Sequence, residues 1–301
     1  MRRSTLWRRI GYRLEAILLH ALFGLARLLP IDAASAIGGS IARTIGPRLP
    51  VSNTGRRNLS QAFPKKSKAE IEAILRGVWD NLGRTTAEYP HLTKIWDYTE
   101  ESTGAKRRVE FVGLEHFAAL RDDGAPGLIF SGHLANWELL PVGAARHNLS
   151  VASLYRPPNN PYAAELVRQI RSAAMGGLIA SGLEGAIGAV RVMEKGGHIG
   201  MLIDQRFRRG IPVPFFGQPA LTATVLAKLA RRFDCPVHGA RVERLGGARF
   251  RVTLSPPLPV PRTEDANADI AAIMAEATAM LEGWIRERPE QWLWLHNRWR
   301  S

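Results

Sequence analysis

A histidine and a glutamate stand five residues apart, where an apolar segment gives way to a helix-forming one. The stretch from Gly127 to Glu138 has the sequence GLIFSGHLANWE. Histidine titrates near neutral pH, so His133 can act as a general base, and a carboxylate such as Glu138 can hold its ring in one tautomer. Helical residues five apart do not share a face. The pair therefore requires His133 to lie in the turn before the helix, which the neighbouring glycine and serine favour.

A histidine and a glutamate at this spacing are by themselves weak evidence, because such pairs are common on protein surfaces. Further motifs downstream raise their weight. They are, in chain order, Tyr155-Arg-Pro-Pro-Asn-Asn-Pro161, Ile203-Asp-Gln-Arg206, Val213-Pro-Phe-Phe-Gly217 and Pro289-Glu-Gln-Trp-Leu-Trp-Leu-His-Asn-Arg-Trp299.

In this order and spacing, the motifs resemble those of the bacterial lipid A late acyltransferases, the lauroyl and myristoyl transferases of the lysophospholipid acyltransferase superfamily. The resemblance runs from Gly38 to the end of the chain. It implies transfer of a fatty acyl group from an acyl carrier protein thioester to a hydroxyl of a lipid A precursor, as a late secondary acylation in lipopolysaccharide biosynthesis. It implies as partners the acyl carrier protein, this anionic glycolipid and the inner membrane surface. It implies no metal and no cofactor besides the acyl donor.

The resemblance also implies substrate-binding residues. Arg171, in the helix after the Arg-Pro motif, would grip a phosphate or sugar acid, and Arg168 one turn away is an equal candidate. Asp204 would pair with such an arginine. Arg156 would contact substrate. The alternatives are a surface helix arginine for Arg171, a strand-end cap for Asp204 and packing beside proline for Arg156.

The chemistry of such a transfer needs a base and an oxyanion site. His133 would deprotonate the hydroxyl, and the leaving thiolate needs less assistance because a thiol is the stronger acid. No Gly-x-Ser-x-Gly motif is present, so Ser131 is interpreted as a turn residue. Backbone N–H groups from Leu134 to Asn136 could stabilise the oxyanion. Gly132 departs from the polar residue that many relatives carry before the histidine.

Composition indicates a polyanionic partner. The 301 residues carry a formal charge of +14, and 34 of the 41 basic residues are arginine. Nucleic acid is the natural rival, but the sequence has no zinc-ligand spacing, no basic heptads and no paired-aromatic sheet motif. The loop arginines 206, 208 and 209 are either solvated or a patch for phosphates or an acidic carrier. The single cysteine, Cys235, excludes an intrachain disulfide.

The N-terminus predicts membrane association. Arg2, Arg3, Arg8 and Arg9 precede the Leu-rich run 14–29, which carries Glu15, His20 and Arg27. A transmembrane helix needs about 20 mostly apolar residues. We therefore expect an interfacial amphipathic helix on the cytoplasmic face of the inner membrane, with a core-packed helix or a single crossing as alternatives.

The pattern along the chain predicts an α/β fold with a mixed sheet and flanking crossover helices, preceded by an N-terminal helical membrane-associating segment. We divide it into residues 1–48 and an acyltransferase domain, 49–301. The segment 67–88 begins with a capping box, Ser67 to Glu70. Expected strands are 109–112, 127–131, 149–155, 198–203, 236–243 and 249–254, the last two forming a hairpin. Expected helices after residue 110 are 114–121, 134–146, 161–174, 183–194, 222–233 and 266–287.

Two other functions compete with the leading one. Within the superfamily, the acceptor would be another glycolipid or a lysophospholipid. From a different class, the chain would be a non-catalytic basic protein that binds membranes or nucleic acid. Turnover of a thioester separates the enzymes from the binding protein.

Overall fold

The computed structural model describes residues 2–99 and 107–299. Its strands are β1 (Val109–Val112), β2 (Leu128–Ser131), β3 (Val151–Tyr155), β4 (Leu178–Ala180), β5 (His198–Leu202), β6 (Ile211–Phe215), β7 (Gln218–Thr222), β8 (Val237–Gly246) and β9 (Arg249–Pro257). Its helices are α1 (Arg2–Leu28), α2 (Ile31–Ile45), α3 (Ser52–Ala62), α4 (Lys68–Glu88), α5 (Leu92–Ile95), α6 (Leu114–Asp122), α7 (Leu139–Arg146), α8 (Pro161–Ala174), α9 (Leu183–Met193), α10 (Val225–Phe233) and α11 (Ala266–Glu287). Short 3₁₀ turns lie at Gly46–Arg48, Tyr89–His91 and Pro289–Gln291.

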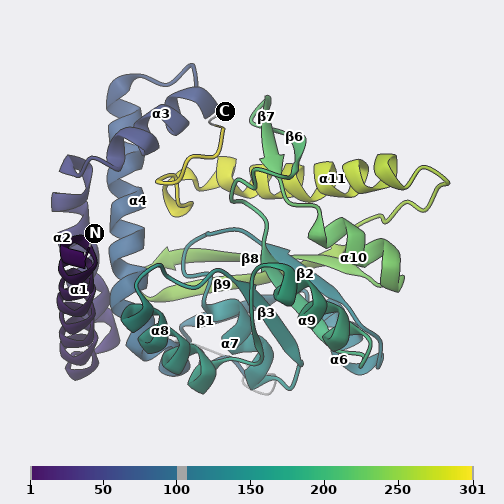
Figure 1. The fold of residues 1–301 in the computed structure, drawn as a ribbon, viewed down its shortest axis with the longest axis horizontal. Helices are drawn as coiled ribbons and strands as arrows, with labels where there is room; N and C mark the ends of the chain where they lie inside the picture. The colour runs from purple at the N-terminus through teal and green to yellow at the C-terminus, as the bar shows by residue number, and fades with distance from the viewer. Residues whose placement is uncertain (1, 100–106, 300–301) are drawn as a thin grey trace.

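Seven strands form one mixed sheet in the order β1-β9-β8-β2-β5-β3-β4. Every neighbouring pair is parallel except β8 and β9, which form the expected hairpin. Helices cover both faces of the sheet, with α11 on one side and α7 and α8 on the other (Figure 1). The predicted mixed α/β architecture is therefore confirmed.

Three strands and one helix start were not predicted. β4 has three residues, and β6 pairs with β7 in a separate two-stranded sheet. Strand β4 is short, and β6 and β7 contain proline, which weakens the alternating pattern that predicts a strand. The helix expected from residue 134 begins at Leu139, because Ala135 adopts a left-handed backbone with φ of 47° that no helix can include. His133 therefore lies in an irregular turn, as the chemistry required.

The first helices form a layer of their own at one edge of the molecule. The capping box is confirmed at the start of α4, where Ser67 and Glu70 exchange hydrogen bonds. Helix α2 packs closely on α4 through facing glycines: a Cβ on Gly38 would lie 2.5 Å from the carbonyl oxygen of Gly83. Helix α4 thus gives α2 a fixed surface to pack on. The opposite side of α4 faces the turn that carries His133.

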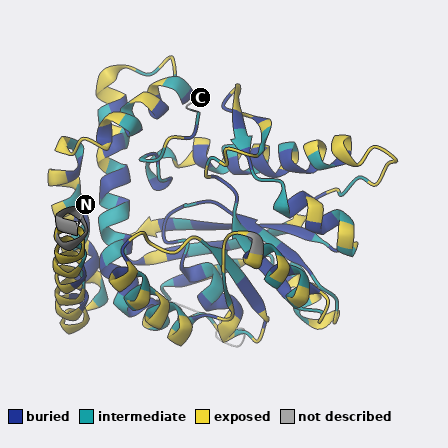
Figure 2. Ribbon diagram, viewed as in Figure 1, coloured by how far each residue is buried: buried dark blue, intermediate teal, exposed yellow. Residues whose placement is uncertain are grey.

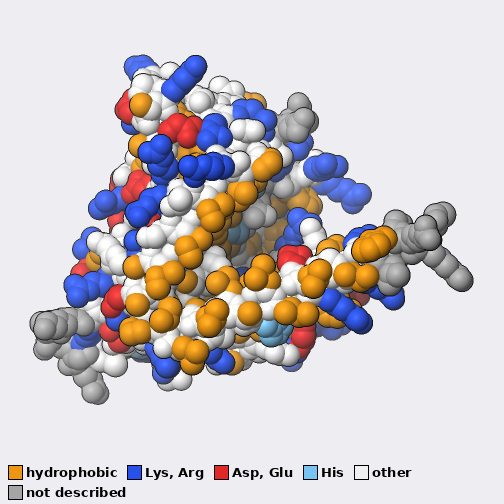
Figure 3. Space-filling view, turned by 90° about the vertical axis from the view of Figure 1, so that its left-hand side faces the viewer, with side chains coloured by type: hydrophobic (Ala, Val, Ile, Leu, Met, Phe, Trp, Pro, Cys, Tyr) orange, Lys and Arg blue, Asp and Glu red, His pale blue; other side chains and the backbone are white. Residues whose placement is uncertain are grey.

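Helix α1 buries only a narrow stripe, formed by Ala16, Phe23 and Ala26. Most of its other side chains from Trp7 onward are exposed, as Figure 2 shows, including large apolar ones such as Leu18 and Leu25. Figure 3 shows hydrophobic side chains in two converging rows on the side where α1 and α2 lie. Within the described residues, no helix combines the length and apolar character needed to span a bilayer. The side chains of Arg2 and Arg3 lie outside the described part.

Candidate active site

His133 and Asp204 are brought together by the register of two neighbouring parallel strands. Strand β2 ends at Ser131 and β5 ends at Leu202, and these two residues are paired across the sheet. His133 and Asp204 each follow two positions later. Parallel strands point their carboxyl ends to the same edge, which is where ligands bind in open α/β sheets. The position of both residues follows from this topology.

Asp204 holds the imidazole of His133 in one tautomer. Nδ1 of His133 lies 2.8 Å from Oδ1 of Asp204, and the backbone N–H of His133 donates to Oδ2 at 2.6 Å. The Asp204 side chain is fully buried and that of His133 is 16% exposed. A carboxylate accepts only, so Nδ1 carries the proton and Nε2 presents its lone pair.

The two partners shift each other's pKa. Burial alone would lower the pKa of His133, but the charge and hydrogen bond of Asp204 outweigh it and raise that pKa. Burial alone would raise the pKa of Asp204, but His133 outweighs it and the pKa lies well below its usual range. The carboxylate therefore stays ionised wherever the histidine titrates.

The turn that carries His133 is anchored by residues far away in the sequence. The carbonyl of Ala135 accepts hydrogen bonds from Asn81 and Thr85 of α4, at 3.1 and 3.0 Å. The Ala135 N–H donates to the carbonyl of Gln291. A left-handed alanine is an unfavourable conformation that surrounding structure must enforce. These contacts enforce it, so the histidine has a fixed position.

The C-terminal motif completes the support of Asp204. Nε1 of Trp292 donates to Oδ2 of Asp204 at 2.7 Å, and His296 contacts the Asp204 carbonyl. Trp292 is 1% exposed, so it belongs to the buried core as well as contacting Asp204. Gly132 also has a physical reason here: a Cβ at that position would lie 2.7 Å from Leu281 and 3.1 Å from the Asp204 carboxylate.

Glu138 does not contact the ring of His133, contrary to the expected orienting role. Its carboxylate forms a bidentate ion pair with Arg171, with distances of 2.5 and 3.0 Å, and accepts a hydrogen bond from Nε1 of Trp137. Asp204, in turn, pairs with His133 and not with an arginine. Glu138 therefore binds the arginine that was expected to pair with Asp204, and Asp204 binds the histidine that was expected to pair with Glu138. Trp137 joins the two pairs, because its ring centroid lies 5.0 Å from that of His133.

The remaining predicted residues divide between the site and the surface. Arg171 is 17% exposed and burial alone would lower its pKa, but the ion pair with Glu138 raises it. Arg168 points outward and pairs with Glu165, which separates the two equal candidates. Arg156 is exposed and bonds to Asn159. The loop arginines are partly or fully exposed.

The expected oxyanion donors are largely unavailable. The N–H of Leu134 donates to the carbonyl of Gly132, and that of Ala135 to Gln291. An amide that was not expected lies at the second ring nitrogen of His133: Nε2 of Gln205 is 3.4 Å from Nε2 of His133. Among the described residues, no group of three or more histidine, cysteine or acidic side chains has the arrangement of a metal site.

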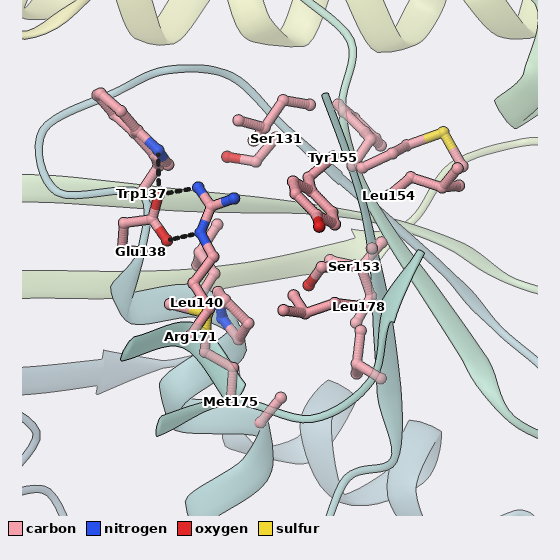
Figure 4. A pocket seen from close by; sticks show the side chains of 18 residues that line it. Ser131, Trp137, Glu138, Leu140, Ser153, Leu154, Tyr155, Arg171, Met175 and Leu178 are labelled. Atoms are coloured by element: carbon pink, nitrogen blue, oxygen red, sulfur yellow. Dashed lines mark hydrogen bonds and ion pairs between the residues drawn. The ribbon is translucent and has the colours of Figure 1, made fainter. Parts of the chain in front are cut away.

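A mostly apolar cavity opens beside the Glu138–Arg171 pair and Trp137. It has a volume of about 100 Å³ and lies between the sheet face and helices α7 and α8. Figure 4 shows Trp137, Glu138 and Arg171 at one side of it and Tyr155 across from them. One nitrogen of Arg171 is turned away from Glu138 toward the cavity, and the guanidinium lies 5.3 Å from the Tyr155 ring centroid.

Sequence reasoning missed three members of this site: Trp137, Gln205 and Tyr89. The first two lie inside motifs that had been singled out, next to residues chosen for their chemistry. Tyr89 follows α4, is 9% exposed and has a buried hydroxyl. Burial first, and then the charge of Glu138, raise the pKa of Tyr89, which places it beside the ion pair. No local signal in the sequence marked it.

Comparison with known proteins agrees with these motifs. The family model described as bacterial lipid A biosynthesis acyltransferase matches residues 2–301. The chain is also similar to the lipid A biosynthesis lauroyltransferase of Escherichia coli (strain K12). The two are 24% identical over 251 residues, which cover 81% of this chain and 78% of that protein.

Proposed function

This chain belongs to the bacterial lipid A biosynthesis acyltransferase family, and we propose that it moves a fatty acyl group from an acyl carrier protein thioester to a hydroxyl of a lipid A precursor. The step would be a late, secondary acylation, and the similarity to a lipid A biosynthesis lauroyltransferase supports the fatty acyl transfer itself. The observation that carries the proposal is the His133–Asp204 pair, which Trp137 links to a mostly apolar cavity: Trp137 packs on the His133 ring and lines the cavity. A base beside an apolar cavity suits an alkyl substrate that reacts at its polar end.

His133 acts as the general base. Its Nε2 takes the proton of the acceptor hydroxyl as the oxygen attacks the thioester carbonyl, and Asp204 stabilises the resulting imidazolium. The tetrahedral intermediate collapses, the carbon–sulfur bond breaks, and the thiolate leaves with the proton from Nε2. An ester replaces the thioester, and no acyl-enzyme is formed.

Two side chains are suited to bind oxygen atoms of the substrate. The Arg171 nitrogen that faces the cavity is a cationic donor, held in place by the bidentate contact to Glu138. The Gln205 amide lies next to the reacting nitrogen and can donate to the oxyanion. Arg156 and the loop arginines at 206, 208 and 209 lie farther out, where they would attract the acidic carrier or the phosphates of the acceptor.

The protein would work on the cytoplasmic face of the inner membrane. Residues 1–48 would form the attachment, because exposed apolar side chains line α1 and α2, for example Leu14, Leu18 and Ile41. Contiguous exposed apolar surface of this kind is typical of a protein or membrane contact. Residues 49–301 would carry the catalytic residues, with no cofactor besides the acyl donor.

The test is transfer by the purified, detergent-dispersed protein. Wild type and His133→Ala are incubated with lauroyl or myristoyl carrier protein and a lipid A precursor, and the lipid is analysed by mass spectrometry. We expect a mass gain of one acyl group with wild type alone. Parallel reactions with a lysophospholipid test the rival acceptor, and a product there but not on the lipid A precursor would overturn the proposal. His116→Ala, remote from the site on α6, is the matched control.

A further inference from the structure

The sheet beneath the cavity has a gap in its side chains at the middle of β5. Across the three strands that underlie the cavity, Gly200 of β5 is paired with Ile129 of β2 and with Ser153 of β3. Gly200 has no side chain and Ser153 has a small one, and both line the cavity. The next row toward the active site carries the larger Leu202 and Tyr155. Two of the three residues in this row are therefore small, and the cavity occupies the space that larger side chains would fill.

The direction of the cavity follows from the contacts at its two ends. Trp137 lines the cavity and packs edge-on against His133, so this end lies nearest the His133 ring. At the other end lie Ala144 of α7 and Val151, the first residue of β3. Both belong to a buried apolar cluster, which closes that end. An alkyl chain entering past Trp137 would cross the Gly200 row before it met this wall.

The geometry points to Gly200 and Ser153 as the residues that fix the longest acyl chain the protein accepts from the donor thioester, with Val151 as the end wall. This inference rests on the proposed acyl transfer and adds its chain-length determinant. Bulk in the Gly200 row shortens the available path, since a Cβ at Gly200 would already lie 3.1 Å from a methyl of Val151. Removal of bulk at Val151 lengthens it.

Two substitutions test the two directions. Ser153→Ile adds an apolar, strand-favouring side chain to the middle of the cavity, and Val151→Ala removes two methyl groups from its end. Turnover is measured with purified protein and a series of saturated acyl carrier protein thioesters that differ by two carbons. We expect Ser153→Ile to lower kcat/KM for the best wild-type chain about tenfold relative to a shorter chain. Val151→Ala should shift the preference toward a longer chain.

The matched control is Ser150→Ile, the same substitution at an exposed position just before β3. It should leave the chain preference unchanged. If Ser153→Ile does not fold, Ser153→Val, which is one methyl group smaller, carries the same comparison.

Active Ser153→Ile and Val151→Ala proteins with the wild-type chain preference would overturn the inference. So would a changed preference for the acyl chains of the acceptor lipid alone, because the cavity would then hold the acceptor. A wild-type protein that turns over none of the thioesters is a different result: it overturns the proposed function, and the inference with it.

Discussion

Asp204 contacts His133 twice, through the ring Nδ1 at 2.8 Å and through the backbone N–H at 2.6 Å. One carboxylate thus fixes both the tautomer of the ring and the turn that carries it. Glu138, which is closer in sequence, is fully occupied by Arg171 and Trp137. The site is therefore built from two separate charged pairs, one suited to proton transfer and one at the mouth of the cavity.

Asp204→Asn should abolish most activity without unfolding the protein. The amide can keep an oxygen toward Trp292 and the His133 backbone N–H, but its NH₂ would then face Nδ1. The ring would have to carry its proton on Nε2, the nitrogen that must act as base. We expect kcat to fall by roughly 10³- to 10⁴-fold, as when a triad carboxylate loses its acceptor. Single-turnover kinetics and circular dichroism measure the two effects; near-normal turnover would contradict the tautomer argument.

The pH dependence of kcat/KM should reveal the His133–Asp204 interaction. Because Asp204 raises the pKa of His133, the base is protonated at low pH, and activity should rise as the pH passes through a pKa above the usual value of about 6.5. Loss of the negative charge in Asp204→Asn should move the residual rise to lower pH. Glu138→Gln should move it less. A larger shift for Glu138→Gln than for Asp204→Asn would contradict this prediction, because Glu138 would then be the main cause of the raised pKa of His133.

Replacing only Glu138 or only Arg171 by alanine should strongly destabilise the protein, and replacing both should cost less than the sum of the two single losses. Glu138 is 4% and Arg171 17% exposed, so either single alanine leaves a charge buried without its partner. Each should cost about 3–5 kcal/mol of unfolding free energy. The double variant should cost clearly less than the sum of the two, which urea denaturation measures. Arg171→Lys should not fully restore stability or activity, because a point charge cannot replace a bidentate contact.

The control for this double-mutant cycle is the Glu165–Arg168 pair on α8, the helix that also carries Arg171. This pair has the same residue types but is exposed. Its coupling should be close to zero, because solvent screens such pairs. Equal coupling in the two cycles would show that burial does not set the strength of the Glu138–Arg171 pair.

Membrane attachment should depend on the exposed face of α1. Leu18 and Leu25 are 71% and 64% exposed and lie seven residues apart on one helix face. Leu18→Glu with Leu25→Glu should leave the fold intact and abolish flotation with anionic vesicles, at low and at high salt. Leu245→Glu, at the exposed end of β8, should float as wild type does. Unchanged flotation of the double variant would place the attachment elsewhere. Deletion of the helix is a poorer test, because it would expose Tyr89, on which Phe23 stacks.

The sequence by itself determined the features that depend on neighbouring residues. The Ser67–Glu70 capping box, the β8–β9 hairpin and the turn at His133 were all predictable, because capping, tight turns and short alternating strands are encoded within a few positions. The position of His133 was also predictable, since a residue between a strand and a helix lies at the ligand edge of an α/β sheet.

Only the tertiary structure decided which residues meet. The order of strands places β5, and not β3, beside β2, and this puts Asp204 rather than Glu138 on the ring of His133. Helix α8 then returns across the sheet face and delivers Arg171 to Glu138. Strand order is set by long-range packing and crossover connections, which leave no mark in the spacing of nearby residues. The candidate residues could therefore be predicted from the sequence, whereas their pairing depends on the tertiary structure.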